Sequence, residues 1–332
     1  MKRKFPPLLK MMKITVIGCG RWGSLITWYL DRKGHDVTLY GRASSAHMQQ
    51  FLTHRSNGLL TLPESVSLAT SLDCVSDAEV LIVSVNSQGL RSLMERELLP
   101  LNLQNKIIVL CMKGIEVESG KRLSEIVEET LDPSNAVAVW LGPGHVQEFY
   151  AGIPNCMVID SRHEDVKTRL VDEFSGDLIR FYYGEDLIGN EIGAAAKNVI
   201  GIAAGALDGM NLSTLKGALM SRGTHEIAKL IEAMGGNPFS AYGLCHLGDY
   251  EATVFSPFSH NRKFGEAFIK GESFDQLAEG YYTAAAIHGL AMRHGVDLPI
   301  CEAVYRSLYE NHDPKAEIGN LFRRSLKREL QR

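Results

Sequence analysis

Closely spaced glycines near the N-terminus suit the binding of an anionic ligand. The apolar run Ile14–Gly18 leads directly into Gly18-Cys19-Gly20-Arg21-Trp22-Gly23, and a helical pattern follows. In such a G-x-G-x-x-G motif, the first glycine permits a tight turn, the second lets the backbone approach a pyrophosphate, and the third allows close packing of helix on strand. Three glycines can also be ordinary turn residues. The strand before them and the helix after them favour a dinucleotide site, with the phosphates at the helix N-terminus.

The residues that follow the second predicted strand, Asp36–Tyr40, indicate whether the protein binds NAD or NADP. An acidic residue at this point would bind the ribose hydroxyls of NAD. The chain instead reads Leu39-Tyr40-Gly41-Arg42, followed by Ala43 and Ser44, without an acid. The planar guanidinium of Arg42 suits a 2′-phosphate, so we expect NADPH/NADP to bind at least as well as NADH/NAD. The alternative is that Arg42 is an ordinary solvated loop residue.

Two later loops also carry groups that could contact a ligand. Lys113-Gly114 follows the predicted strand Lys106–Cys111, and Gly142-Pro143-Gly144-His145 follows the predicted strand Ala136–Leu141. Ligands of open α/β sheets bind beyond the carboxyl ends of the strands. We therefore expect both loops to face cofactor and substrate, although each could be an ordinary glycine-bearing turn.

The elements that must position these residues alternate between strands and helices in the first part of the chain. This alternation predicts an α/β Rossmann domain with a doubly wound, mostly parallel sheet at residues 13–188. Helical patterns then replace the strands and predict an all-α domain at residues 189–330. The predicted strands are Ile14–Gly18, Asp36–Tyr40, Glu79–Val85, Lys106–Cys111, Ala136–Leu141, Cys156–Asp160 and Ile179–Tyr183, and the predicted helices of the second domain are Gly189–Leu207, Thr224–Met234, Phe274–His294 and Leu298–Glu310.

Length and hydropathy are consistent with this division. A chain of 332 residues suits two domains, because single hydrophobic cores stop growing near about 250–300 residues. Residues 1–12 lack the apolar run of a signal peptide, and we interpret them as a flexible tail. No stretch approaches the roughly 20 uninterrupted apolar residues that a membrane span needs.

Net charge and cysteine spacing limit the kinds of ligand and partner that the chain can bind. A net charge of −4 offers no basic surface for nucleic acid, so we expect a small-molecule partner. The six cysteines are scattered without a C-x-x-C pair, which indicates neither a zinc site nor a disulfide scaffold. We expect a protein of the reducing cytoplasm that holds no metal.

A series of motifs gives the chain a family resemblance from Lys13 to about Leu330. The chain resembles the bacterial type of NAD(P)-dependent glycerol-3-phosphate dehydrogenase. The order of the motifs is more specific than any single one of them. They are Gly18–Gly23, Lys113-Gly114-Ile115-Glu116, Gly142-Pro143, Glu191–Ile200, Ser221-Arg222-Gly223, Leu247-Gly248-Asp249-Tyr250 and Ser259-His260-Asn261-Arg262.

The resemblance implies roles for individual residues. Lys197 matches the catalytic lysine of the family. Positions around the substrate are matched by Lys113, Asn198, Asp249, Thr253 and Asn261, and we also expect Gly142, Gly144, Ser259, His260 and Arg262 near the substrate. Positions that contact the cofactor are matched by Gly18, Gly20, Arg21, Trp22, Gly23, Arg42, Lys113, Val146, His260 and Glu279.

The chemistry of carbonyl reduction explains why such residues are needed. Reducing dihydroxyacetone phosphate requires a hydride and a proton for the developing alkoxide. We hypothesise that Lys197 is the general acid and base, that Lys113 stabilises the oxyanion, and that Asp249 orients the ammonium. The residues alone favour a solvated lysine at position 197 and a helix N-cap at Asp249.

The chain departs from the family pattern at two positions near the expected substrate. The usual sequence is Ser-Arg-Asn-Arg, and here His260 replaces the first arginine, which serves both phosphate and cofactor. A histidine has an ordinary pKa of about 6.5, so it is cationic mainly in acidic solution unless bound phosphate raises that pKa. Gly144 stands where the family has Ser or Thr. We interpret His145 beside it as an ordinary loop residue rather than a replacement donor.

Two alternatives remain open at the level of sequence. One is a related Rossmann-plus-helical dehydrogenase that acts on a hydroxy or keto acid, which would need a carboxylate site rather than a phosphate site. The other is a non-catalytic dinucleotide sensor, which would have no need for Lys113, Lys197 and Asp249. For the leading hypothesis we expect a homodimer and a product that supplies glycerophospholipid synthesis.

Overall fold

The apolar runs of the N-terminal half form one sheet of parallel strands with a single antiparallel pair. The computed structural model describes residues 11–326 and 328–329. Among them, the strand order is β3-β2-β1-β4-β5-β6-β7-β8, and only β6 and β7 are antiparallel. The strands are β1 Lys13–Ile17, β2 Asp36–Tyr40, β3 Ser67–Ala69, β4 Val80–Val83, β5 Ile107–Leu110, β6 Ala136–Leu141, β7 Asn155–Ser161 and β8 Ile179–Tyr183. The predicted fold class is confirmed, and β3 is a short edge strand that the sequence did not indicate.

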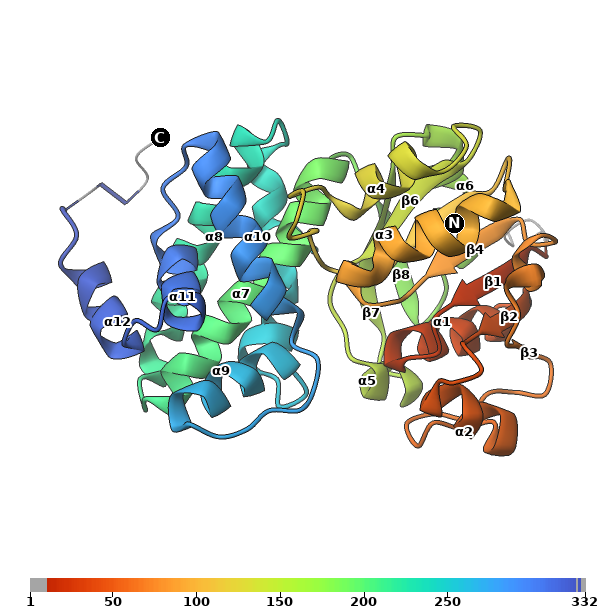
Figure 1. Cartoon of the computed structure of the whole chain (residues 1–332), viewed down its shortest axis with the longest axis horizontal. Helices are drawn as coiled ribbons and strands as arrows, with labels where there is room; N and C mark the ends of the chain where they lie inside the picture. The colour runs from red at the N-terminus through yellow and green to blue at the C-terminus, as the bar shows by residue number, and fades with distance from the viewer. Residues whose placement is uncertain (1–10, 327, 330–332) are drawn as a thin grey trace, which may run out of the picture. The chain divides into compact units, whose positions relative to one another are not determined.

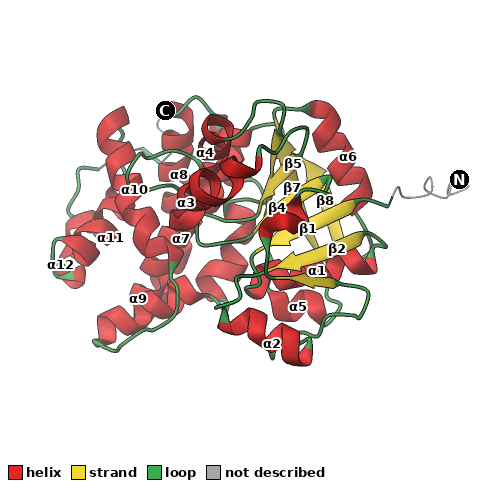
Figure 2. Ribbon diagram, turned by 45° about the vertical axis from the view of Figure 1, so that its right-hand side comes forward, coloured by secondary structure: helices red, strands yellow, loops and turns green. Residues whose placement is uncertain are grey.

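Helices flank this sheet on its two faces (Figure 2). Helix α1 packs beside α5, and the Tyr29 hydroxyl of α1 donates to the Phe174 carbonyl of α6. Tyr29, Trp140 and Phe174 are almost fully buried in the core, where the Trp140 ring meets Tyr29 edge-on and Phe174 at a tilt. The helices of this half are α1 Arg21–Arg32, α2 Ala46–His54, α3 Leu90–Leu93, α4 Leu123–Thr130, α5 Val146–Tyr150 and α6 Glu164–Phe174.

The start of the sheet lies closer to the N-terminus than expected. Residues 1–10 of the predicted tail lie outside the described residues. Met11 is exposed, but the Met12 side chain is fully buried in the core of the sheet. The Met12 carbonyl also accepts a hydrogen bond from the Asp36 backbone. The interpretation of residue 12 as tail is therefore wrong, because an apolar side chain beside β1 gains by burial.

The chain divides into two compact units within the long helix α7, Leu187–Gly209. The first unit extends to Lys113 and includes Lys121–Glu191, and the second begins at Ile192. Gly114–Gly120 belongs to the second unit although it lies inside the range expected for the first domain. The domain limits of 13–188 and 189–330 stay predictions.

The second unit is helical and is built around α7, which runs along the bundle in Figure 1. Glycines allow two of its helices to approach backbone to backbone. A Cβ atom on Gly205 would lie 1.8 Å from the Arg262 carbonyl oxygen, and one on Gly265 would lie 2.1 Å from that of Ile202. Its helices after α7 are α8 Lys216–Ala233, α9 His260–Lys270, α10 Glu279–His294, α11 Pro299–Tyr309 and α12 Pro314–Phe322.

Helices α9 and α12 were not predicted, and their N-caps explain why they form. The Ser259 hydroxyl accepts from the Arg262 backbone N–H, and the Asp313 carboxylate accepts from that of Lys315. Ser259 therefore caps α9, and His260, Asn261 and Arg262 form its first turn. Among the described residues, no helix combines the length and apolar character required to cross a membrane.

Candidate functional site

The glycine motif forms a tight junction between β1 and α1. Gly18 has a φ of +116°, a conformation that side chains disfavour, and its amide donates to the Tyr40 carbonyl of β2. A Cβ on Gly23 would lie 1.9 Å from the Gly18 carbonyl oxygen, so Gly23 permits the helix to pack on the turn. A Cβ on Gly20 would meet nothing within 4 Å. This open space at the N-cap of α1 fits the approach of a pyrophosphate.

Arg21, Trp22, Val146 and Arg42, which are also expected at the cofactor, lie in the first unit. Arg21 donates to the Gln147 side chain at 3.2 Å, and the rings of Trp22 and Phe149 lie 6.0 Å apart. Val146 is buried at the first position of α5. Arg42 follows β2 and is exposed, which leaves its guanidinium accessible to solvent.

The loops after β5 and β6 meet through one hydrogen bond. Lys113 donates from Nζ to the Gly142 carbonyl oxygen at 2.7 Å. Gly144 has a φ of +137°, and a Cβ there would lie 2.2 Å from the Phe149 ring. The sequence could not foresee this role of Phe149. A hydroxyl-bearing residue at position 144 has no room beside this ring, so the second departure from the family pattern has a steric explanation.

The proposed catalytic residues of the second unit form a buried ion pair. Lys197 on α7 donates from Nζ to Asp249 Oδ2 at 2.9 Å and to Thr253 Oγ1 at 2.6 Å. The exposed fractions of the Lys197 and Asp249 side chains are only 9% and 1%. The solvated-lysine interpretation of Lys197 is therefore wrong. Asp249 ends the short 3-10 helix η7, Leu247–Asp249, so it is not an N-cap either.

The Asn261 side-chain amide connects α9 to Asn198, the residue after Lys197 on α7, and to the start of α10. Asn261 donates to Asn198 Oδ1 at 3.0 Å and accepts from the Gly280 backbone N–H at 2.9 Å. Gly280 can approach this closely because a Cβ on it would lie 2.6 Å from the Asn198 carbonyl oxygen. Glu279, an expected cofactor contact, is the first residue of α10 and is half-buried. The structure thus brings Lys197, Asn198, Asp249, Thr253, Asn261 and Glu279 together in the second unit.

His260 and Arg262, at the start of α9, have different partners. His260 contacts the Leu277 carbonyl oxygen through Nδ1 at 3.2 Å and is half-buried. Arg262 donates to Asp208 Oδ2 at 2.8 Å and to Glu266 Oε2 at 3.2 Å. The Arg262 guanidinium is therefore already bound to two carboxylates.

A buried ion pair that sequence reasoning missed holds the beginning of α7. Arg122 donates to Glu191 Oε2 at 2.6 Å, and both oxygens of Glu191 accept from Ser124. Arg122 and Glu191 are both more than nine-tenths buried. The only sequence signal was the position of Glu191 in the family motif. This network anchors the helix that carries Lys197.

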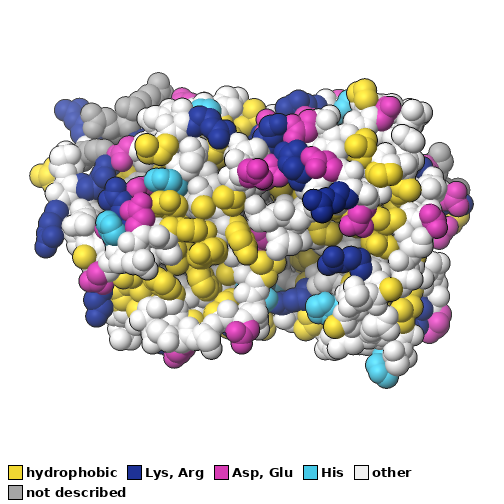
Figure 3. Space-filling view, in the orientation of Figure 1, with side chains coloured by type: hydrophobic (Ala, Val, Ile, Leu, Met, Phe, Trp, Pro, Cys, Tyr) yellow, Lys and Arg dark blue, Asp and Glu magenta, His cyan; other side chains and the backbone are white. Residues whose placement is uncertain are grey.

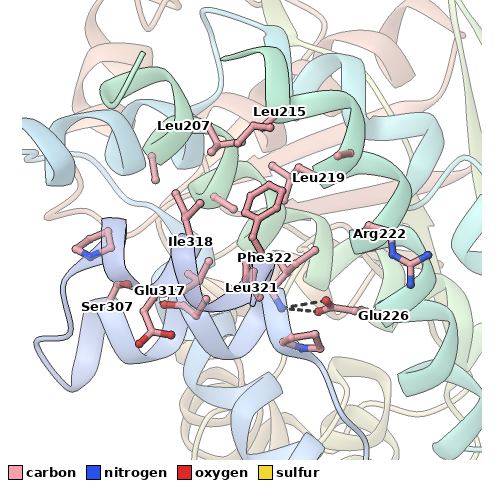
Figure 4. Close-up of a pocket in the computed structure, with 18 of the residues that line it drawn as sticks. Leu207, Leu215, Leu219, Arg222, Glu226, Ser307, Glu317, Ile318, Leu321 and Phe322 are labelled. Atoms are coloured by element: carbon pink, nitrogen blue, oxygen red, sulfur yellow. Dashed lines mark hydrogen bonds between the residues drawn. The ribbon is translucent and has the colours of Figure 1, made fainter. Parts of the chain in front are cut away.

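A separate cavity of about 680 Å³ lies in the second unit among α7, α8, α11 and α12 (Figure 4). None of the predicted site residues lines it. Its lining is mainly apolar, and Glu226 at its edge accepts from the Ile300 backbone N–H. Burial raises the pKa of Glu226 to about 8. The lining carries both basic and acidic side chains, so no ligand charge is favoured.

The fold and site together define a class of protein. A Rossmann sheet with an open glycine junction and a separate helical unit that buries a lysine and an aspartate are features of a nicotinamide-dependent oxidoreductase. Residues 13–167 match the family described as NAD-dependent glycerol-3-phosphate dehydrogenase N-terminus, and residues 186–319 match its C-terminus counterpart. The chain belongs to this family, and the predicted resemblance is confirmed.

Similar proteins support the family assignment over nearly the whole chain. Glycerol-3-phosphate dehydrogenase [NAD(P)+] of Prosthecochloris aestuarii is 37% identical and covers 96% of this chain and 100% of its own length. The enzyme of the same name from Exiguobacterium sp. is 35% identical, with 97% and 98% covered. A crystal structure of glycerol-3-phosphate dehydrogenase from Coxiella burnetii has a TM-score of 0.88 at 28% identity and covers 95% of this chain and 99% of that one.

Two glycine substitutions separate cofactor binding from folding. Gly20→Ala places its methyl group in open space, so we expect an unchanged melting temperature. That space is where the pyrophosphate should approach, so the Kd for NADPH should rise at least about tenfold. Gly23→Ala forces a methyl group against the Gly18 carbonyl and should lower the melting temperature as well. Thermal unfolding and fluorescence titration with NADPH measure both quantities.

Equal affinity of Gly20→Ala and wild type for NADPH would contradict the assignment of this junction to the cofactor. Equal stability of Gly23→Ala and wild type would contradict the packing role of Gly23.

Proposed function

We propose that this chain reduces dihydroxyacetone phosphate to sn-glycerol 3-phosphate with NADPH or NADH, and catalyses the reverse reaction. The observation that carries the proposal is the buried contact of Lys197 with Asp249 and Thr253. Such a pair supplies a positioned proton donor, which a dinucleotide sensor would not need. Family membership favours a phosphorylated triose over a hydroxy or keto acid.

The residues of the chain would then divide the work of carbonyl reduction. A bound nicotinamide supplies the hydride. Lys197 gives a proton from Nζ to the substrate oxygen and takes one back in the reverse reaction. Asp249 holds the ammonium in orientation, and Lys113 stabilises negative charge on the reacting oxygen. Asn198, the residue after Lys197 on α7, and Thr253, which accepts from Lys197, help to orient the substrate.

Binding of the substrate phosphate would involve the start of α9. Asn261 and His260 offer donors there, and the helix N-terminus favours negative charge. Ser259 is occupied as the N-cap and Arg262 is bound to carboxylates, so their part in phosphate binding is the less direct one. Gly142 and Gly144 would contribute backbone close to the substrate. His260 would also contact the cofactor.

We further propose a cytoplasmic homodimer whose product supplies glycerophospholipid synthesis. All six cysteines are free, which suits a reducing compartment. Apolar side chains gather on the face of the second unit shown in Figure 3. Large exposed apolar residues of that unit include Met292 and Phe322, with exposed fractions of 74% and 72%. Exposed apolar surface of this kind is typical of protein interfaces.

A substrate panel tests the proposed activity. Oxidation of NADPH and NADH should be rapid with dihydroxyacetone phosphate and at least about a hundredfold slower, in kcat/KM, with unphosphorylated dihydroxyacetone or small keto acids. NADPH should be used at least as efficiently as NADH because of Arg42. Absorbance at the nicotinamide band measures each rate.

The same panel distinguishes the alternatives. Turnover of a keto acid alone would favour the related hydroxy-acid dehydrogenase. Absence of turnover with every substrate, together with thermal stabilisation by NADPH but none by glycerol 3-phosphate, would favour a sensor.

Replacement of His260 by arginine tests the phosphate site. If the imidazolium binds phosphate, the KM of wild type for dihydroxyacetone phosphate should rise by up to about tenfold per pH unit above the pKa of His260, whereas the KM of His260→Arg should rise less. Titration of the substrate phosphate affects both proteins alike and cancels in the comparison. His260→Gln, which is neutral throughout, should bind weakly at every pH. Parallel pH profiles for wild type and His260→Arg would contradict a role for His260 in phosphate binding.

A further inference from the structure

A buried histidine links the segment that carries Asp249 to the helix that carries Lys197. His246 lies immediately before η7 and is fully buried. Its Nδ1 lies 2.8 Å from the carbonyl oxygen of Gly193, which is four residues before Lys197 on α7. The His246 carbonyl also accepts from the Asp249 backbone N–H at 3.0 Å. His246 is therefore hydrogen-bonded both to the helix that carries Lys197 and to the backbone of Asp249.

The hydrogen bonds fix the protonation of this histidine. A carbonyl oxygen only accepts, so Nδ1 carries the hydrogen and donates to Gly193. Nε2 then accepts from the Tyr250 hydroxyl at 2.7 Å. Burial, with a smaller effect of Lys197, lowers the pKa of His246 to about 4. The ring is therefore neutral near physiological pH and does not itself transfer protons in that range.

The fit around the ring is close, as a positioning role requires. A Cβ on Gly193 would lie 3.0 Å from the His246 Cβ, so α7 approaches this residue at a position without a side chain. Tyr250 is also fully buried, and its hydroxyl lies 3.5 Å from Thr224 Oγ1 on α8. The bond of Nδ1 to Gly193 and the close approach of α7 hold the ring on the side that faces the helix of Lys197.

We propose that His246 is a positioning residue for the proposed reaction, which holds the Asp249 carboxylate against the Lys197 ammonium through its bond to the Gly193 carbonyl. This inference rests on the proposed function. The bond between His246 and Gly193 joins the segment that begins η7 to the turn of α7 that precedes Lys197. Neither the motif that contains Lys197 nor the one that contains Asp249 includes His246.

If His246 positions Asp249, its replacement should change the pH dependence of kcat as well as the size of kcat. Among described residues of the second unit, Asp249 contacts Lys197 directly and His246 interacts with it electrostatically. A nearby carboxylate favours the protonated lysine. If loss of the His246 bond lets Asp249 move away, the ammonium becomes a stronger acid. The alkaline limb of kcat for reduction, where the proton donor is lost, should then move to lower pH.

Four variants of the full-length chain separate the two bonds of the ring. His246→Leu removes both bonds, and His246→Gln places its amide too far along the side chain to replace Nδ1. His246→Asn places its amide nitrogen near the position of Nδ1 and should keep the bond to Gly193. Tyr250→Phe removes only the bond to Nε2 and serves as the matched control. Each protein is measured for melting temperature, NADPH affinity, and kcat and KM between about pH 6 and pH 9.

We expect His246→Leu and His246→Gln to lose at least about tenfold in kcat near neutral pH, with KM changed less. Their alkaline limb should move down by at least about half a pH unit. His246→Asn and Tyr250→Phe should keep the limb of wild type. NADPH affinity should stay unchanged in all four.

A purely structural role of His246 gives a different pattern. Equal loss of kcat at every pH without movement of the limb, or an Asn variant that behaves like the Leu variant, would overturn the inference. If the Leu variant does not fold, the Gln, Asn and Phe variants still decide between the outcomes. Failure of the proposed function would instead show in wild type, which would not reduce dihydroxyacetone phosphate, and the inference would fall with it.

Discussion

The contact between Lys197 and Asp249 is the interaction on which this account depends. Removing two charges from water costs several kcal/mol for each ion, and their attraction offsets that cost only when the geometry is good and further hydrogen bonds are made. The 2.9 Å contact and the added bond to Thr253 meet this condition. A lysine held in this way is fixed in position, which suits proton transfer to a carbonyl oxygen better than a flexible surface lysine would.

Close packing of other segments against α7 accompanies the burial of this pair. Helix α7 carries small residues where other segments approach it: a Cβ on Gly201 would lie 2.8 Å from Thr253, and Gly205 meets the backbone of α9. The buried bond between Arg122 and Glu191 holds the start of the same helix. These contacts fix the backbone of α7 at Glu191, Gly201 and Gly205.

The sequence predicted those features that depend on local pattern. Gly18, Gly20 and Gly23 were recognised because their spacing alone encodes the turn, and the strands were found because their apolar runs are continuous. Helix α9 was missed because Gly265 and nearby Pro257 resemble breaks in a helix, whereas Gly265 in fact allows α9 to pack against α7.

Features that depend on distant residues could not be predicted in this way. His246 meets Gly193 across 53 positions, and Phe149 fills the space beside Gly144 only because α5 folds back on its own loop. Neither pairing leaves a periodic signal. Burial of Met12 likewise depends on its alignment with β2 and not on the composition of the tail. The roles of Lys197 and Asp249 came from resemblance, since each residue alone has an ordinary interpretation.

Chemical rescue of Lys197→Ala distinguishes a proton donor from a structural lysine. We expect this variant to lose about 10²–10⁴-fold in kcat for dihydroxyacetone phosphate reduction, with NADPH binding intact. Small primary ammonium ions should restore part of this rate in proportion to their protonated concentration, and tetramethylammonium, which has no proton to give, should not. Near-normal kcat in Lys197→Ala, or equal stimulation by tetramethylammonium and ethylammonium, would contradict the assignment of Lys197 as the proton donor.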